Sequence, residues 1–155
     1  ESDMHSEYAG MGTTIVICYM DGKNTYISHV GDSRAYLYKD TLKQITADDT
    51  FVNELVKRGL INAEEASHHP KRNVLVQAIG IKEALRISFY KIEEDYRAIL
   101  LCSDGLYNSL SSQQIEEILQ KNASVDQKTE CLIQSANEFG GLDNIGVLLI
   151  EKGEA

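Results

Sequence analysis

Short runs of β-branched and aromatic residues, separated by turn sequences such as Asp21-Gly22-Lys23-Asn24, fill the first third of the chain. Residues of these types favour the pleated, half-buried surface of a strand, and tight turns join strands that run in opposite directions. We therefore expect a mainly antiparallel sheet. The expected strands cover residues 13–20, 25–30, 34–39, 42–45, 73–76, 85–90, 97–102 and 144–150.

The segment between the early and the late strands has a helical pattern instead. Apolar side chains at helical spacing predict a helix over residues 49–58, which Gly59 ends. Asn62 can cap a second short helix over residues 63–67. We expect this polar, helix-rich insert, about residues 49–72, to form a lid or side module rather than part of the core.

Two longer helices are expected near the end of the chain. Ser111 and Gln114 form a capping-box pattern that opens the first, and residues 125–139 form the second. Because two such helices must cover a face of the sheet, the fold class is α+β. The side chains expected to face inward are Ile115, Ile118 and Leu119 in the first helix, and Leu132, Ile133, Ala136 and Phe139 in the second.

Composition and charge narrow the class of protein. The 155 residues, 43% of them hydrophobic, contain no linker or repeat, which indicates a single domain. The formal net charge is -9, so phosphate backbones and anionic membranes would repel the chain, and neither nucleic acid nor membrane is an expected partner. Cys18, Cys102 and Cys131 are odd in number and widely spaced, which indicates reduced core cysteines of a cytoplasmic protein rather than disulfides or zinc ligands.

Three aspartates, Asp32, Asp104 and Asp143, each border an apolar run and have a glycine within three residues. Taken singly, each is more simply explained as a turn former. Taken together, they could place several carboxylates at one sheet edge, where only protons or cations would relieve their repulsion. Carboxylate oxygens favour Mg²⁺ or Mn²⁺, and two such ions can activate a water and hold a phosphoryl group. The sequence alone leaves open whether the three converge.

Six stretches, in order along nearly the whole chain, resemble the type 2C metal-dependent protein phosphatases (PPM) in their compact bacterial form. They are Gly-Met-Gly-Thr-Thr at 10–14, His-Val-Gly-Asp-Ser-Arg-Ala-Tyr at 29–36, Asp-Thr-Phe-Val-Asn-Glu-Leu-Val at 49–56, His-Pro-Lys-Arg-Asn at 69–73, Leu-Cys-Ser-Asp-Gly-Leu at 101–106 and Gly-Gly-Leu-Asp-Asn-Ile at 140–145.

The resemblance implies a fold and a site. The fold would be an antiparallel β-sandwich flanked by helices on both outer faces, a four-layer αββα arrangement, here incomplete at its N-terminus. Asp104 and Asp143 would bind a pair of Mn²⁺ or Mg²⁺ ions and act in catalysis through metal-bound water. Asp32 would bind a third, weaker ion together with Asp104. The insert at about residues 49–72 would be the flap beside the active site.

The chain also departs from the family pattern. Family members carry an N-terminal Arg- and Asp-bearing segment and an Asp-Gly-x-Gly-Gly motif, and neither occurs here, since Asp21-Gly22 is followed by Lys23-Asn24. The missing aspartate bridges the paired ions in the family. We therefore expect the chain to be a C-terminal portion that binds metal weakly and is nearly inactive alone.

The function implied for the parent protein is hydrolysis of phosphoserine and phosphothreonine in cytoplasmic proteins, the targets of a bacterial Ser/Thr kinase. One alternative is a non-catalytic regulatory or binding domain of the same fold, although the retained Asp32, Asp104 and Asp143 argue against it. Another is a fragment that is active only when joined to its N-terminal half. Exposed sandwich edges would also allow the chain to associate with a second copy.

Overall fold

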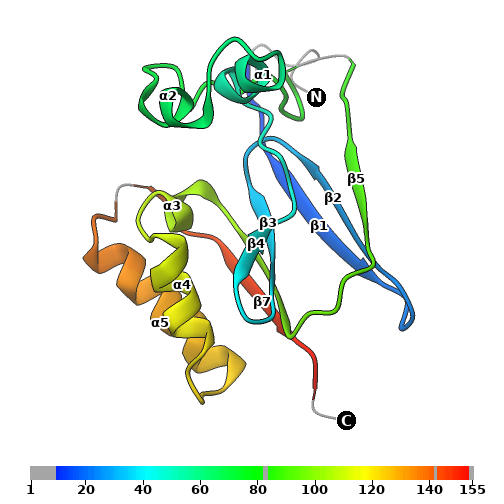
Figure 1. Cartoon of the computed structure of the whole chain (residues 1–155), viewed down its shortest axis with the longest axis vertical. Helices are drawn as coiled ribbons and strands as arrows, with labels where there is room; N and C mark the ends of the chain where they lie inside the picture. The colour runs from blue at the N-terminus through cyan, green and yellow to red at the C-terminus, as the bar shows by residue number, and fades with distance from the viewer. Residues whose placement is uncertain (1–9, 82–83, 142, 154–155) are drawn as a thin grey trace.

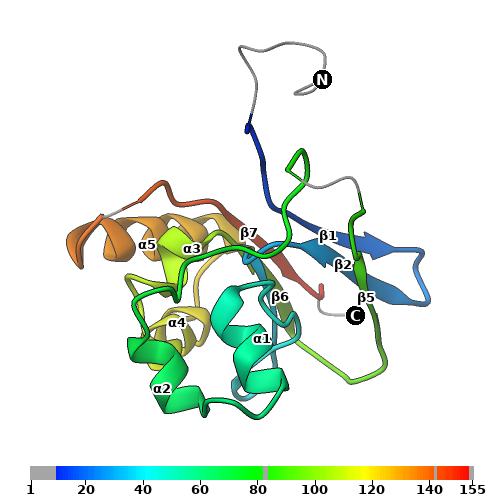
Figure 2. The ribbon, with the colours of Figure 1, turned by 90° about the horizontal axis from the view of Figure 1, so that it is seen from above.

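The computed structural model describes residues 10–81, 84–141 and 143–153. These residues form two antiparallel sheets packed face to face, with helices against one sheet and at one end of the sandwich (Figures 1 and 2). The first sheet has the order β1-β2-β5 and the second β4-β3-β6-β7, which confirms the expected α+β sandwich. The strands are β1 (Ile15–Met20), β2 (Thr25–Val30), β3 (Arg34–Tyr38), β4 (Leu42–Gln44), β5 (Ser88–Ile92), β6 (Ala98–Cys102) and β7 (Val147–Glu151).

The hairpin of β1 and β2 follows directly from its turn sequence. The Asp21 carboxylate accepts hydrogen bonds from the backbone amides of Lys23, at 2.9 Å, and Asn24, at 2.7 Å, which closes the turn. The register that results pairs Tyr19 with Tyr26. Both strands and the tight turn between them are therefore confirmed.

Strand β6 is buried on both faces, and it organises the core. Ile99 and Leu101 pack with Ile27 in the cluster between the two sheets. Leu100 and Cys102 alternate with them and belong to the cluster on the helix side. This two-sided burial explains why the sequence of β6 is continuously apolar instead of alternating.

Two helices, α4 (Ser112–Leu119) and α5 (Val125–Glu138), cover the outer face of the second sheet (Figure 1). Both begin with a complete capping box, Ser111 with Gln114 and Ser124 with Gln127. The burial expected for Ile115, Ile118, Leu119, Leu132 and Ala136 is confirmed.

The inward orientation expected for Phe139 is wrong. Its side chain is 64% exposed, because Phe139 is the C-cap of α5 and lies beyond the last helical turn. Ile133 is only partly buried.

The strand expected at residues 73–76 is also wrong. Only Leu75 pairs, in an isolated bridge to Thr50. The amide of Val74 donates a hydrogen bond of 3.1 Å to the carbonyl of Lys71 within a turn, so it does not pair with a strand. This segment therefore lies beside the start of α1 (Phe51–Lys57) and does not extend a sheet.

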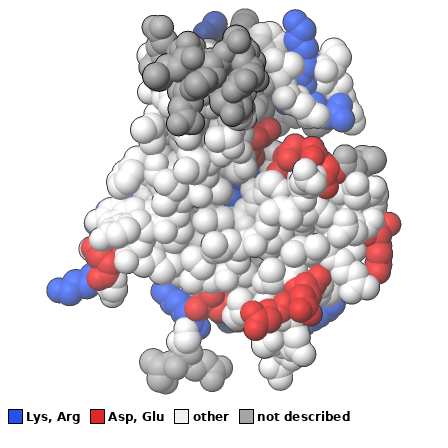
Figure 3. Space-filling view, turned by 180° about the vertical axis from the view of Figure 1, so that it is seen from behind, with Lys and Arg blue, Asp and Glu red and all other residues white. Residues whose placement is uncertain are grey.

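No helix of the described residues covers the outer face of the first sheet. On that face, Tyr26 stacks between Tyr19 and Phe89, with ring centroids 6.2 Å and 5.5 Å away, and Tyr19 and Phe89 are 60% and 67% exposed. The side on which the edge strands β1 and β7 lie shows a broad surface with few charges (Figure 3). The helical layer implied for the outer face of the first sheet is therefore not among the described residues. None of the described helices is long and apolar enough to span a bilayer.

Candidate functional site

Two of the three aspartates singled out above lie at the same end of the second sheet. Strands β3 and β6 are antiparallel neighbours whose register pairs Arg34 with Cys102. Asp32 lies two residues before Arg34, and Asp104 lies two residues after Cys102. Because antiparallel pairing brings the start of one strand beside the end of the other, the sheet itself brings Asp32 and Asp104 together.

Asp32 occupies a tight turn between β2 and β3 that glycine makes possible. Gly31 has a φ of 107°, and a Cβ atom there would lie 2.3 Å from the Cγ2 of Thr14. The Gly31 amide donates to the Asp49 carboxylate at 3.0 Å, and the Asp49 amide donates to the Gly31 carbonyl at 2.8 Å. These contacts fix the backbone that presents Asp32.

Asp104 begins a one-turn helix, α3 (Asp104–Tyr107), directly after β6. Sequence reasoning missed this helix because four residues are too few to show helical periodicity. Gly105 is required at its second position, since a Cβ atom there would lie 2.4 Å from the Asn144 carbonyl oxygen. The start of α3 is thereby packed directly against the segment that precedes β7.

The carboxylates of Asp32 and Asp104 are near enough to affect each other. Burial first, and then the negative charges of Asp104 and Asp48, together raise the pKa of Asp32 to about 6. Both side chains are partly buried. Neither belongs to a salt bridge in the part of the chain that the structure describes. Two half-buried carboxylates that form no salt bridge of their own are a suitable site for a cation.

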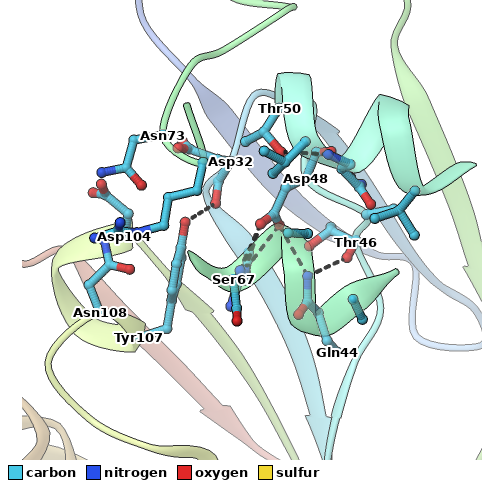
Figure 4. Close-up of a pocket in the computed structure, with 18 of the residues that line it drawn as sticks. Asp32, Gln44, Thr46, Asp48, Thr50, Ser67, Asn73, Asp104, Tyr107 and Asn108 are labelled. Atoms are coloured by element: carbon cyan, nitrogen blue, oxygen red, sulfur yellow. Dashed lines mark hydrogen bonds and ion pairs between the residues drawn. The ribbon is translucent and has the colours of Figure 1, made fainter. Parts of the chain in front are cut away.

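A cavity of about 670 Å³ opens beside these carboxylates (Figure 4). Its opposite wall comes from α1 and from α2 (Ala63–His68), the two helices of the expected lid. Arg72 and Asn73, from the segment after α2, also line it. The segment that was expected to form a lid therefore lines the same cavity as Asp32 and Asp104.

Arg34 forms an ion pair with Asp48. Its Nε and Nη2 atoms donate to the Asp48 carboxylate, the latter at 2.7 Å, and its Nη1 donates to the Tyr36 hydroxyl at 3.1 Å. The guanidinium also lies 3.4 Å from the centroid of the Tyr107 ring. Sequence reasoning did not assign Asp48 or Tyr107 to the site. The only available signals were spacings, since Tyr107 is three residues after Asp104 and Arg34 is two after Asp32.

The third aspartate, Asp143, belongs to a segment that lies beside α3, but its side chain is hydrogen-bonded within its own segment. The neighbouring Asn144 carbonyl accepts a hydrogen bond from the Ser103 hydroxyl at 3.1 Å, so this segment lies beside the start of α3. The Asp143 side chain is exposed and accepts a hydrogen bond from the Asn144 amide at 2.7 Å. Within the described ranges, no three His, Cys, Asp or Glu side chains gather to hold a metal ion. Leu142 of the same stretch lies outside the described residues.

Comparisons of the sequence and of the structure with known proteins match the chain to one and the same group. The family model described as protein phosphatase 2C matches residues 1–138. The serine/threonine phosphatase stp of Listeria welshimeri is 40% identical over 154 residues. The crystal structure of the serine/threonine phosphatase Stp1 from Staphylococcus aureus matches with a TM-score of 0.91 at 34% identity. The catalytic domain of the phosphatase PstP, solved with two manganese ions, matches with a TM-score of 0.78 at 36% identity.

The match covers most of this chain but only part of each relative. It includes 98% of the chain and 60% of the Listeria protein, and 99% of the chain and 61% of the Staphylococcus structure. For the PstP structure the shares are 95% and 61%. The chain thus spans about three fifths of the length of the relatives that it matches.

Proposed function

The chain belongs to the protein phosphatase 2C family, and from this membership we propose that it supplies part of the metal-binding active site of a serine/threonine protein phosphatase. The substrates would be phosphoserine and phosphothreonine in proteins, including the targets of a bacterial Ser/Thr kinase. The observation that carries the proposal is that Asp32 and Asp104 lie together at the edge of a cavity, and that neither forms a salt bridge among the described residues.

The donor set suits Mn²⁺ or Mg²⁺. Asp32 and Asp104 offer carboxylate oxygens, and the amide side chains of Asn73 and Asn108 line the same cavity. Such hard oxygen donors are the ligands these ions prefer, and the PstP relative was solved with two manganese ions. A divalent ion held there would supply Lewis acidity and lower the pKa of a bound water.

The chain's own residues would hold and orient the reactants. Asp104 and Asp143, the latter from the segment packed against α3, would help to hold the paired ions, and Asp32 would hold a third, weaker ion together with Asp104. Arg72, at the cavity wall, would attract an incoming phosphate group. The segment at about residues 49–72, which contains α1 and α2, would act as the flap beside the site, since both helices line the cavity.

A non-catalytic binding domain of the same fold is the second candidate. One observation favours it, because Asp143 does not join Asp32 and Asp104 in a three-member cluster within the described ranges. Under this hypothesis the pair would not bind a cation selectively, and replacing either carboxylate would not change cation binding.

A site-resolved metal titration separates these candidates. Mn²⁺ broadens the NMR signals of nearby amides, so we expect selective broadening around residues 31–33 and 103–106 of the full chain. Asp32→Asn and Asp104→Asn should each weaken the apparent affinity about tenfold or more, since each removes a ligand charge. Asp126→Asn, which changes an exposed acid on α5, is the matched control and should have no effect.

Activity gives the second measurement. The chain alone is expected to hydrolyse a phosphothreonine peptide far more slowly than a full-length relative, because it lacks the Asp-Gly-x-Gly-Gly motif. Weak broadening that is spread evenly over the amide signals, and that Asp32→Asn and Asp104→Asn do not change, would contradict the metal site. If the chain alone were as active as a full-length relative, the expectation that it holds only part of the active site would be wrong.

A further inference from the structure

We propose that Tyr107 is a positioning residue that sets the separation of Asp32 and Asp104. The inference rests on the proposed metal site and adds to it a residue that would touch neither metal nor substrate. Its hydroxyl donates a hydrogen bond of 3.0 Å to the backbone carbonyl of Asp32 (Figure 4). Tyr107 thus connects the two segments from which the carboxylates extend.

Such a connection is needed because the sheet does not reach the carboxylates. The ladder between β3 and β6 ends with the pair Arg34 and Cys102. Beyond it, Asp32 continues into a turn and Asp104 into α3, so their backbones are no longer held to each other by strand pairing. Among the hydrogen bonds of the described residues, the one from Tyr107 joins this turn to α3.

The position of Tyr107 on α3 suits this role. It lies three residues after Asp104, so the two side chains share one side of the single helical turn. Any tilt of α3 would therefore move the Tyr107 hydroxyl and the Asp104 carboxylate together. A hydroxyl fixed to the Asp32 carbonyl limits that tilt.

The ring of Tyr107 is itself held in place. The Arg34 guanidinium lies 3.4 Å from the ring centroid, and its fork is fixed by the Asp48 carboxylate at 2.7 Å to 3.1 Å. Together, the side chains of Tyr107, Arg34 and Asp48 form a rigid support beside the carboxylate pair.

The test removes one hydroxyl and follows the metal site. Tyr107→Phe keeps the ring and its contact with Arg34 but deletes the hydrogen bond to Asp32. We expect the apparent Mn²⁺ affinity, measured from the broadening of amide signals around residues 31–33 and 103–106, to fall about tenfold, the lower range for loss of an outer-shell partner.

Tyr96→Phe is the matched control. The Tyr96 hydroxyl is hydrogen-bonded to Thr25 at 2.8 Å, and Lys152 lies 4.1 Å from the centroid of its ring. The control therefore deletes a buried tyrosine hydroxyl beside a cation, as Tyr107→Phe does, but away from the cavity. Its Mn²⁺ affinity should stay within about twofold of the unchanged chain, because no atom of the site is disturbed.

A double-mutant cycle shows whether Tyr107 acts through Asp32. In the Asp32→Asn background, Tyr107→Phe should have little further effect on Mn²⁺ affinity, because the group that it positions no longer contributes a charge. An equal loss in both backgrounds would show a general structural effect and overturn the inference.

The remaining outcomes separate this inference from the proposed function. If Asp32→Asn and Asp104→Asn weaken Mn²⁺ binding but Tyr107→Phe does not, the inference is wrong and the metal site stands. If the unchanged chain shows no selective broadening at all, the metal site and the inference fail together.

Discussion

At the scale of single residues, the most distinctive group is the Asp32 carboxyl. Its pKa is raised to about 6 because burial and the charges of Asp104 and Asp48 disfavour its ionised form. A raised acid pKa means that the folded chain binds this proton more tightly than the unfolded chain. The contribution of Asp32 therefore favours folding at low pH and is lost as the pH rises toward about 6.

Asp32→Asn should remove that pH dependence. We expect the free energy of unfolding of the unchanged chain, relative to the variant, to fall by about 1 kcal/mol between about pH 4 and pH 6, after allowance for solvent screening of a partly exposed group. Urea unfolding of both proteins across this range measures the difference in their free energies of unfolding. The contributions of the other carboxyl groups cancel in that difference. A difference that stays constant with pH would contradict the raised pKa.

The sequence indicated some residues of the site and not others, for physical reasons. Asp32 and Asp104 could be predicted because each follows or precedes a strand and lies beside glycine. Tyr107 could not, because its role depends on a hydrogen bond to a residue 75 positions away. The role of Asp143 stays a prediction.

At the scale of elements, the best-predicted features are those with local causes. The capping box of α4 and the Asn62 cap of α2 were predicted because each depends on side chains three residues apart. The capping box of α5, Ser124 with Gln127, was not predicted although it has the same spacing. The strand expected at residues 73–76 failed because its backbone pairs with the start of α1, a contact that no local pattern encodes.

The caps of α4 and α5 should contribute measurably to stability. Ser111→Ala and Ser124→Ala each remove a side-chain acceptor for the amide at the third helical position, and each should lower the free energy of unfolding by about 1 kcal/mol. Ser112→Ala, inside the first turn of α4, is the control and should change it by less than about 0.5 kcal/mol. Urea unfolding provides the measurement, and equal effects at Ser111 and Ser112 would exclude the capping role.

At the scale of the whole molecule, the described helices cover only one of the two outer faces of the sandwich. The two late helices and the antiparallel class were predicted because periodicity is a local signal. Which faces they leave open was not predicted, since it depends on how the sheets pack. The outer face of the first sheet exposes Ile17, Tyr19 and Phe89, and its edge strand β1 has a free side among the described residues.

This open face should promote self-association of the isolated chain. In about 0.15 M salt, which screens the net charge of -9, we expect the average mass in sedimentation equilibrium to rise with concentration. Ile17→Lys should abolish the rise, because it places a charge in the apolar face, which is 47% exposed at that residue. Gln134→Lys, on the exposed side of α5, should leave it intact. A chain that stays monomeric at high concentration would refute this expectation.

The stacked row of Tyr19, Tyr26 and Phe89 also gives the molecule a natural optical probe. The chain has eight tyrosines and no tryptophan, so its ultraviolet emission comes from tyrosine alone. Tyr19 is among the more exposed large side chains and lies on the uncovered sheet. Any polypeptide that covers this face would exclude water from these rings, and unlabelled protein would report the event through a change in fluorescence.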